Sequence, residues 1–89
     1  MKLTVEKKAL ENALKKTVYE KKAPLPILTA IHLQAKNRKL IVKGTNLEQY
    51  TTFILDAEVE EDGEVCIFGK TIDNIVKVLP VEFFYFIFF

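Results

Sequence analysis

The sequence predicts an α+β fold: a duplicated β-α-β-β-β unit in which an antiparallel sheet carries two helices on one face, with the second unit incomplete. Three observations predict this fold class. The spacing of apolar residues changes between the period of a strand and that of a helix. Prolines and glycines stand at those changes, and a six-residue pattern returns 62 positions later. With 89 residues, the chain has room for one domain.

The first elements are a short strand and a helix. Residues 2–5 are apolar and β-branched, which favours a strand. From Glu6 to about Tyr19, apolar side chains recur at spacings of three and four, which predicts an amphipathic helix. Pro24 and Pro26 close this segment, because proline lacks the N–H that a helix needs and restricts the residue before it.

Strands fill the middle of the chain. Residues 27–36 alternate between apolar and polar side chains, and residues 39–43 follow a polar turn, so the two predict a hairpin. Residues 44–46 are expected to form another turn. One long strand is then expected from Tyr50 to Glu60. Glu-Asp-Gly at 61–63 marks its end, and a further strand is expected over residues 64–68.

A second helix is predicted after Gly69 and is stopped by Pro80. Its four apolar residues lie at i, i+3, i+4 and i+7, and all are expected to be buried. They are Ile72, Ile75, Val76 and Leu79. Residues 83–89 have the composition of a strand but are apolar on both faces.

The chain contains an internal repeat. Residues 10–15 and 72–77 have the same residue type at every position, and Lys8 lies over Lys70 in the same frame. The strand preceding each helix matches as well. These matches divide the partial domain, residues 1–89, into one unit at about 2–63 and an incomplete unit at about 64–89.

Charge is distributed unevenly along the chain. Residues 1–43 hold eleven basic and three acidic side chains, a net of +8, whereas residues 44–89 hold two basic and nine acidic ones, a net of −7. The separation predicts a surface that meets a polyanion, bordered by acidic neighbours.

Polar residues on the two predicted helices form matching outer faces. The first helix is expected to turn Lys8, Asn12, Lys15, Lys16 and Tyr19 away from the core, and the second to turn Lys70, Asn74 and Lys77 away. Solvated helix surfaces would give the same pattern. The functional interpretation is contact with a phosphate backbone without base readout, since Lys supplies a mobile charge and Asn a neutral donor.

The composition argues against catalysis, cofactors, small-molecule substrates and membranes. The chain has no Ser, one His and one Cys, so no metal-ligand set can be assembled from Cys and His. His32 is expected on the polar face of a strand, Cys66 as a small buried side chain, and the acids at 58–64 as a solvated edge. No apolar run reaches the ~20 residues of a membrane helix, and the N-terminus lacks a signal peptide, so the cytoplasm is the expected location.

The order of several motifs resembles the N-terminal region of the bacterial DNA polymerase III sliding clamp, the β subunit. The motifs are Met1-Lys2-Leu3-Thr4-Val5 before a helix, Leu25-Pro26-Ile27-Leu28, Lys43-Gly44-Thr45-Asn46-Leu47-Glu48, and Val78-Leu79-Pro80. This resemblance implies the DNA-clamp fold and a ring of two three-domain chains around duplex DNA. Sheets would lie outside and helices would line the hole. Such a ring tethers the polymerase to its template and has no catalytic site.

The resemblance also implies roles for particular residues. Lys22 occupies the position of a DNA-contacting basic residue. Lys70, Thr71 and Leu79 fall at the interface of a head-to-tail homodimer, although Thr71 replaces a base that some members carry. Polymerase and clamp-loader subunits are the implied protein partners. Their binding pocket lies in later domains, which this stretch does not cover.

Residues 83–89 depart from the family pattern, because they lack the alternation expected of its strand. An altered reading frame, an artificial end or a divergent relative would each explain that. Two other functions remain open: a small free-standing nucleic-acid-binding domain, and an interaction module whose aromatic C-terminal strand adds to a partner's sheet.

Overall fold

The structure, a computed structural model, describes residues 1–19, 30–46 and 48–88. These residues form seven strands and two helices. In chain order they are β1 (Lys2–Glu6), α1 (Lys7–Lys16), β2 (Ala30–Lys36), β3 (Lys39–Thr45), β4 (Tyr50–Asp56), β5 (Glu58–Glu61), β6 (Gly63–Phe68), α2 (Gly69–Val78) and β7 (Phe83–Ile87).

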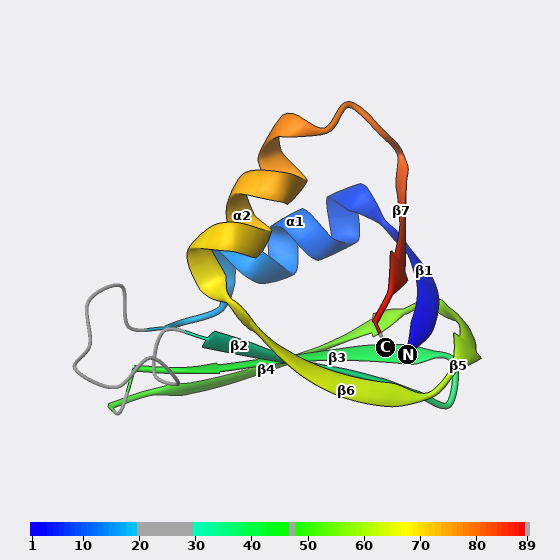
Figure 1. The fold of residues 1–89 in the computed structure, drawn as a ribbon. Coiled ribbons are helices and arrows are strands. Elements are labelled where there is room, and N and C mark those ends of the chain that lie inside the picture. Colours follow the sequence, from blue (N-terminus) through cyan, green and yellow to red (C-terminus); the bar gives the residue numbers. More distant parts are fainter. Residues whose placement is uncertain (20–29, 47, 89) are drawn as a thin grey trace.

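The strands form two antiparallel sheets with the helices on one side. One sheet has the order β4-β3-β2-β6 and the other the order β5-β1-β7. Figure 1 shows α1 and α2 together over one face of the four-stranded sheet, while β1 and β7 rise beside them. The predicted α+β class is therefore confirmed, with two sheets where one was expected.

The two halves of the chain are arranged alike. α2 begins and ends 62 residues after α1, the separation of the sequence repeat. The strand after α1, β2, pairs with the strand before α2, β6, and the strand after α2, β7, pairs with the strand before α1, β1. The two units thus pair reciprocally, so each sheet contains strands of both.

The hydrophobic core lies between the sheets and the helices. Alternate residues of β1, β2 and β3 face it, since successive side chains of a strand point to opposite sides. The fully buried members with the largest side chains are Leu3, Val5, Leu10, Ile31, Leu33, Leu40, Val42, Ile72 and Val76. Each contributes roughly 1.5–3 kcal/mol by leaving water.

Helix α1 ends at Lys16, three residues before the predicted end. The hydroxyl of Thr17 donates to the carbonyl of Ala13 at 2.7 Å, and its N–H to that of Leu14 at 3.3 Å. The next N–H, that of Val18, donates to Oγ1 of Thr51 in β4 at 3.1 Å. The backbone therefore leaves the helix to bond to the sheet, although the apolar pattern continues through Val18.

The predicted strand from Tyr50 to Glu60 is in fact two strands in different sheets. The strand is interrupted at Ala57, whose N–H donates to the carbonyl of Arg38 at 3.1 Å. Phe53, Leu55 and Val59 on either side all pack against the core. Because the alternation runs unbroken through the corner, periodicity alone could not reveal the change of sheet.

The turn expected at residues 44–46 lies further along the chain. Gly44 is a buried residue inside β3, paired with Thr51 of β4. The turn forms after it, where the side-chain oxygen of Asn46 accepts the N–H groups of Glu48 and Gln49 at 3.1 and 2.8 Å. Asn caps a turn in this way because its side chain reaches the backbone two or three residues on.

The β2–β3 hairpin closes through a two-residue loop with positive backbone angles. Asn37 has φ of 50° and Arg38 has φ of 61°, while Lys36 pairs with Lys39. Positive φ at both loop positions is the type I′ geometry, which matches the strand twist. Asn tolerates this region, but the Cβ of Arg38 is strained there by its contact with the following carbonyl.

Arg38→Gly is expected to stabilise the protein by about 1 kcal/mol, because glycine adopts positive φ without a Cβ clash. Urea unfolding monitored by circular dichroism measures the change. Arg38→Ala is the matched control: it removes the same long side chain but keeps the Cβ, and should not stabilise. Equal stabilisation by both variants would show that backbone strain is not the cause.

Helix α2 buries less than its sequence predicts. Ile72 and Val76 are buried, but Ile75 is 38% and Leu79 42% exposed, so the expectation that all four are buried is wrong for two of them. α2 contacts α1 and the edge strand β6, and Ile75 and Leu79 lie on the side of the helix that these contacts leave open. Within the described ranges, neither helix has the length and hydropathy needed to cross a bilayer.

Candidate nucleic-acid interface

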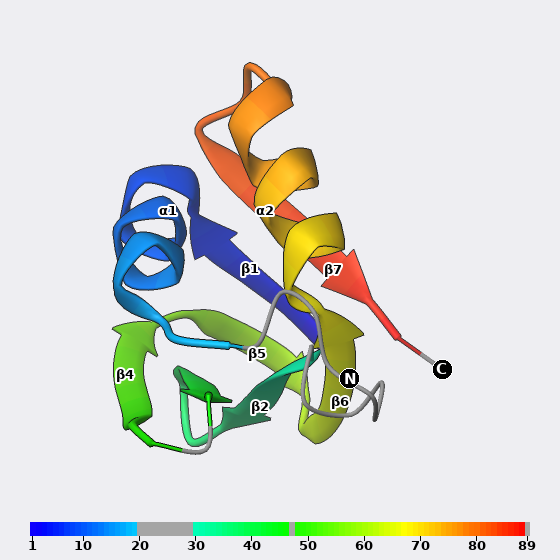
Figure 2. The same cartoon turned by 90° about the vertical axis from the view of Figure 1, so that its left-hand side faces the viewer.

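The outer faces of α1 and α2 carry the polar residues expected to meet a polyanion. Leu10, Ala13 and Leu14 anchor α1, and Ile72 and Val76 anchor α2. The side chains on the opposite faces are exposed: Lys8, Asn12, Lys15 and Lys16 from α1, and Lys70, Asn74 and Lys77 from α2. Because the helices contact each other (Figure 2), these side chains border one continuous surface.

Each helix ends in positive charge. Lys15 and Lys16 occupy the last turn of α1, and Lys77 that of α2, where cations offset the helix dipole. Nζ of Lys15 lies 3.6 Å from Oε1 of Glu11 one turn earlier, an exposed pair that contributes little. Lys15 remains 63% exposed, so it can exchange that carboxylate for a phosphate.

Tyr19 was expected on the outer face of α1 beside the lysines, but it lies elsewhere. It follows the end of α1, its ring packs against the core, and its hydroxyl donates to Oδ2 of Asp73 in α2 at 2.8 Å. A Cβ placed on Gly69 would approach its ring to 2.6 Å, so the ring fills the space beside α2 that glycine leaves. Tyr19 therefore joins the two halves of the chain.

Burial, the hydrogen bond to Asp73 and the charge of that carboxylate raise the pKa of Tyr19 from 10.0 to about 12. The neutral phenol is thus favoured in the folded state. Its contribution to stability is complete below pH 10 and is lost as the pH rises toward about 12, because only the unfolded chain ionises in that window.

Tyr19→Phe is expected to cost about 1 kcal/mol at neutral pH, since it removes one hydrogen bond. The difference between wild type and variant should shrink as the pH rises from 10 to about 12. Urea unfolding of both proteins across this range measures it. Other titrating groups are common to both proteins and cancel, so a constant difference would contradict the role of the Tyr19 phenol.

The remaining expected site residues are exposed or lie outside the described residues. Lys22 lies outside them. Lys70 and Thr71 are exposed in the first turn of α2. Leu79 is the capping residue just after α2, and its carbonyl accepts a hydrogen bond from Nζ of Lys7 at 2.7 Å, which joins the ends of the two helices. The large exposed side chains around Leu79 were not foreseen; they include Ile75, Val78 and Val81.

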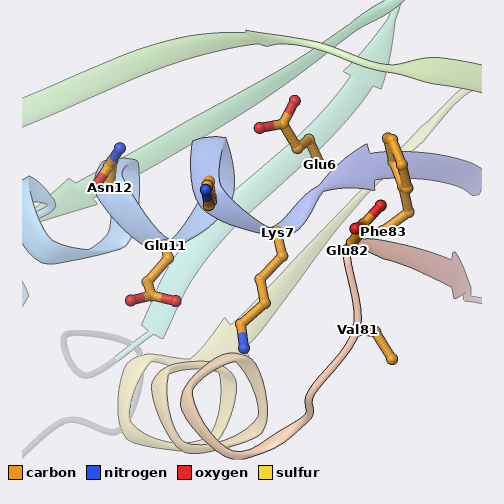
Figure 3. A pocket seen from close by; sticks show the side chains of 8 residues that line it. Glu6, Lys7, Glu11, Asn12, Val81, Glu82 and Phe83 are labelled. Atoms are coloured by element: carbon orange, nitrogen blue, oxygen red, sulfur yellow. The ribbon is translucent and has the colours of Figure 1, made fainter.

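A pocket lies beside the start of α1 (Figure 3). Three of the side chains that line it are carboxylates, those of Glu6, Glu11 and Glu82. Lys7 extends from the pocket toward α2, in agreement with its bond to Leu79. Lys8 and Asn12 line the same pocket, so these carboxylates border the polar face of α1 at its N-terminal end.

The outer face of the four-stranded sheet holds the only His and Cys of the sequence. Cys66 is exposed, so the expectation of burial is wrong. His32 lies opposite it in the β2–β6 ladder, and Nε2 of His32 is 3.3 Å from Oε2 of Glu64. These residues stand on the sheet face that is turned away from the core, and no metal-binding group of three or more His, Cys, Asp or Glu side chains occurs among the described residues.

Comparison with known protein families gives one match that covers nearly the whole chain. Residues 1–88 match the family described as DNA polymerase III beta subunit, N-terminal domain. The beta sliding clamp of Rickettsia felis is 34% identical over 82 residues, which are 90% of this chain. The chain spans 22% of the length of that relative.

Solved structures give the same result. Caulobacter crescentus pol III beta superposes with a TM-score of 0.86 at 32% identity, over 92% of this chain and 23% of that one. The Helicobacter pylori beta clamp bound to a DNA ligase peptide has a TM-score of 0.88 at 27% identity, over 96% of this chain and 25% of that one.

Proposed function

Because the chain belongs to the family of DNA polymerase III beta subunit N-terminal domains, we propose that it acts as part of a DNA sliding clamp. In this role α1 and α2 face duplex DNA and hold it without sequence preference, and the assembled clamp tethers a polymerase. The observation that carries the proposal is the exposed lysine and asparagine surface on two adjacent helices.

The chemistry of this surface suits a backbone contact that can slide. Lysine ammonium groups on long, exposed side chains follow phosphates as DNA moves, and the amides of Asn12 and Asn74 add neutral donors. Neither residue type is held in the fixed geometry that base readout requires, because neither is buried. The helices are positioned by the core behind them, so the surface keeps its shape.

Further parts of the proposal concern the assembly. Lys70, Thr71 and Leu79 would contact a second chain in a head-to-tail homodimer, and Lys22 would add a DNA contact. Polymerase and clamp-loader subunits would be the protein partners, in the cytoplasm. The clamp would be non-catalytic and would use no cofactor, small-molecule substrate or membrane. The exposed apolar side chains beside Leu79 support a protein contact at that end of α2.

Binding of the 89-residue chain to fluorescent duplex DNA tests the proposal. Anisotropy titrations at several salt concentrations should give a weak binding constant whose logarithm falls with the logarithm of the salt concentration at a slope of about −2.7 to −3.6, as expected for three or four phosphate contacts. Unrelated duplex sequences should bind equally. Binding that does not change with salt, or that depends on sequence, would refute the phosphate-contact surface.

A further inference from the structure

The outer face of the three-stranded sheet, the face turned away from the core, carries an apolar strip. Phe83, Tyr85 and Ile87 of β7 are 58%, 50% and 44% exposed. The residues between them, Phe84 and Phe86, pack against the core. Because successive side chains of a strand point to opposite faces, the three exposed ones form a single row. A row of large apolar side chains in contact with water is typical of an interaction surface.

The exposure of this strip is a property of the sheet face and not of the edge of β7. Tyr85 pairs with Thr4, and His32 pairs with Cys66, which lies 62 positions after Thr4, so Tyr85 and His32 occupy equivalent places in the two halves. β2 has a strand on both edges, yet the side chain of His32 is 30% exposed. A further strand beside β7 would likewise widen the sheet and leave its outer face open.

Carboxylates border the strip on the same face. Glu58 and Glu60 of β5 are exposed, and Oε2 of Glu60 accepts a hydrogen bond from the hydroxyl of Tyr85 at 3.1 Å. Glu6 of β1 is exposed as well and lies opposite Phe83 (Figure 3). Within the described parts of the chain, neither Glu6 nor Glu58 forms an ion pair. Their negative charge is therefore open to a partner.

A hollow of about 630 Å³ adjoins Phe83 on this face and reaches across β1 to the corner between β4 and β5. Glu6, Asp56 and Glu58 line it together with the ring of Phe83. Asp56 is already paired with Lys39, which leaves the other two carboxylates. An aromatic ring beside free carboxylates suits the aliphatic stem and the cationic group of a lysine or arginine side chain.

We infer that this outer face, formed by Phe83, Tyr85 and Ile87 with the glutamates beside them, binds a basic amphipathic helix of a partner protein. The face of a sheet offers side chains and no free backbone groups, so the bound segment must satisfy its own backbone hydrogen bonds, as a helix does. The four-stranded sheet carries α1 and α2 on its inner face in the same way (Figure 1).

Charge selects the basic helix over other occupants. The apolar stripe of such a helix would cover the strip on β7, and lysine or arginine side chains at its borders would meet Glu6 and Glu58. The same carboxylates repel nucleic acid and acidic proteins. The outer face of α1 in a second copy is basic too, but it holds lysine and asparagine where an apolar stripe is needed.

The probe is a labelled synthetic peptide of leucine and lysine in the pattern of an amphipathic helix, titrated with the 89-residue chain and followed by fluorescence anisotropy. Two peptides of the same length serve as controls. One has glutamine in place of leucine and keeps only the positive charge, and the other has glutamate in place of lysine and keeps only the apolar stripe. The leucine–lysine peptide should bind roughly tenfold or more tightly than either control.

Variants of the chain locate the binding face. Phe83→Ala should weaken binding of the leucine–lysine peptide by roughly tenfold, as for a central aromatic contact. Ile54→Ala, the matched control, removes a side chain that is 64% exposed on the outer face of the other sheet, and should bind as wild type does. Glu58→Gln should weaken binding roughly twofold to fivefold at low salt, whereas Glu48→Gln, in the turn after β3, should not.

Three results would overturn the inference: no binding of the leucine–lysine peptide, equal binding of the glutamine–lysine control, or equal weakening by Phe83→Ala and Ile54→Ala. Self-association of the chain without peptide that Phe83→Ala abolishes would also overturn it, because a second copy would then be the occupant. The DNA proposal is tested separately. Phe83→Ala removes no charge and lies outside the lysine surface, so it should keep the wild-type salt dependence of DNA binding whether or not the peptide binds.

Discussion

Gly44→Ala is expected to lower the free energy of unfolding by about 3 kcal/mol or more, a large fraction of the stability of a chain this size. A Cβ on Gly44 would lie 2.1 Å from the carbonyl oxygen of Val18 and 2.5 Å from Cγ2 of Thr17. The first contact is with backbone, so it cannot be relieved by a rotamer change. The segment after α1 would have to move off β3, breaking the Val18–Thr51 bond. Urea unfolding followed by circular dichroism measures the loss.

Gly63→Ala is the matched control for Gly44→Ala. Its Cβ would lie 2.9 Å from Cβ and 3.3 Å from Cα of the buried Met1, longer approaches than the 2.1 Å at Gly44. We expect a loss of about 1 kcal/mol, below that for Gly44→Ala. Where a strand has room, replacing glycine by alanine stabilises it by about 0.5–1 kcal/mol. A neutral or stabilising Gly44→Ala would therefore show that the close approach of Val18 is absent.

The spacing of apolar residues predicted the elements that pack one regular apolar face against the core along their whole length. The helix starting after Glu6, the β2–β3 hairpin and α2 were all predicted near their observed places, because each presents a regular apolar face. The repeat predicted the matching of the two helices. Helix ends were less accurate: α1 stops at Lys16 because the next backbone groups bond to β4, and no local residue announces that.

The errors arise where distant parts of the chain meet. A corner such as Ala57 keeps the alternation of a single strand, since residues on both sides face one core. The residue types around Gly44 predicted a turn. Gly44 instead lies in a strand, where the lack of a side chain allows the backbone of Val18, 26 positions earlier in the sequence, to approach closely. Tyr19 had the helical position of an exposed residue and instead bonds to Asp73 of the other half.

The polar surface of α1 and α2 was predicted more fully than the exposed apolar surfaces that could bind other proteins. Helical spacing alone places Lys8, Asn12 and Lys15 opposite the buried stripe, and the structure leaves them exposed. The apolar exposure around Leu79 and along β7 needs the packing to be known, because apolar residues in sequence are expected to be buried.

Replacing Lys8, Lys15 and Lys16 by glutamine is expected to make the slope of log binding constant against log salt concentration less steep by about 2.7. This is the sum for three phosphate contacts at about 0.9 each. Affinity at low salt should fall roughly tenfold or more. Glutamine has a helix propensity close to that of lysine, so the cost to α1 is limited to the lost dipole contacts of Lys15 and Lys16, about 0.3–1 kcal/mol each. Anisotropy titration of one duplex at several salt concentrations measures both quantities.

The matched control replaces Lys36, Lys39 and Lys43 by glutamine, which removes the same charge from exposed positions of the four-stranded sheet. Lys39 pairs there with Asp56, an exposed pair whose loss costs little stability. These residues lie on the face of the sheet that points away from the helices, since their neighbours Leu40 and Val42 face the core. If DNA contacts the helices, the control should keep nearly the wild-type slope. Equal losses in both triple variants would mean that net charge, rather than the surface of α1 and α2, attracts the DNA.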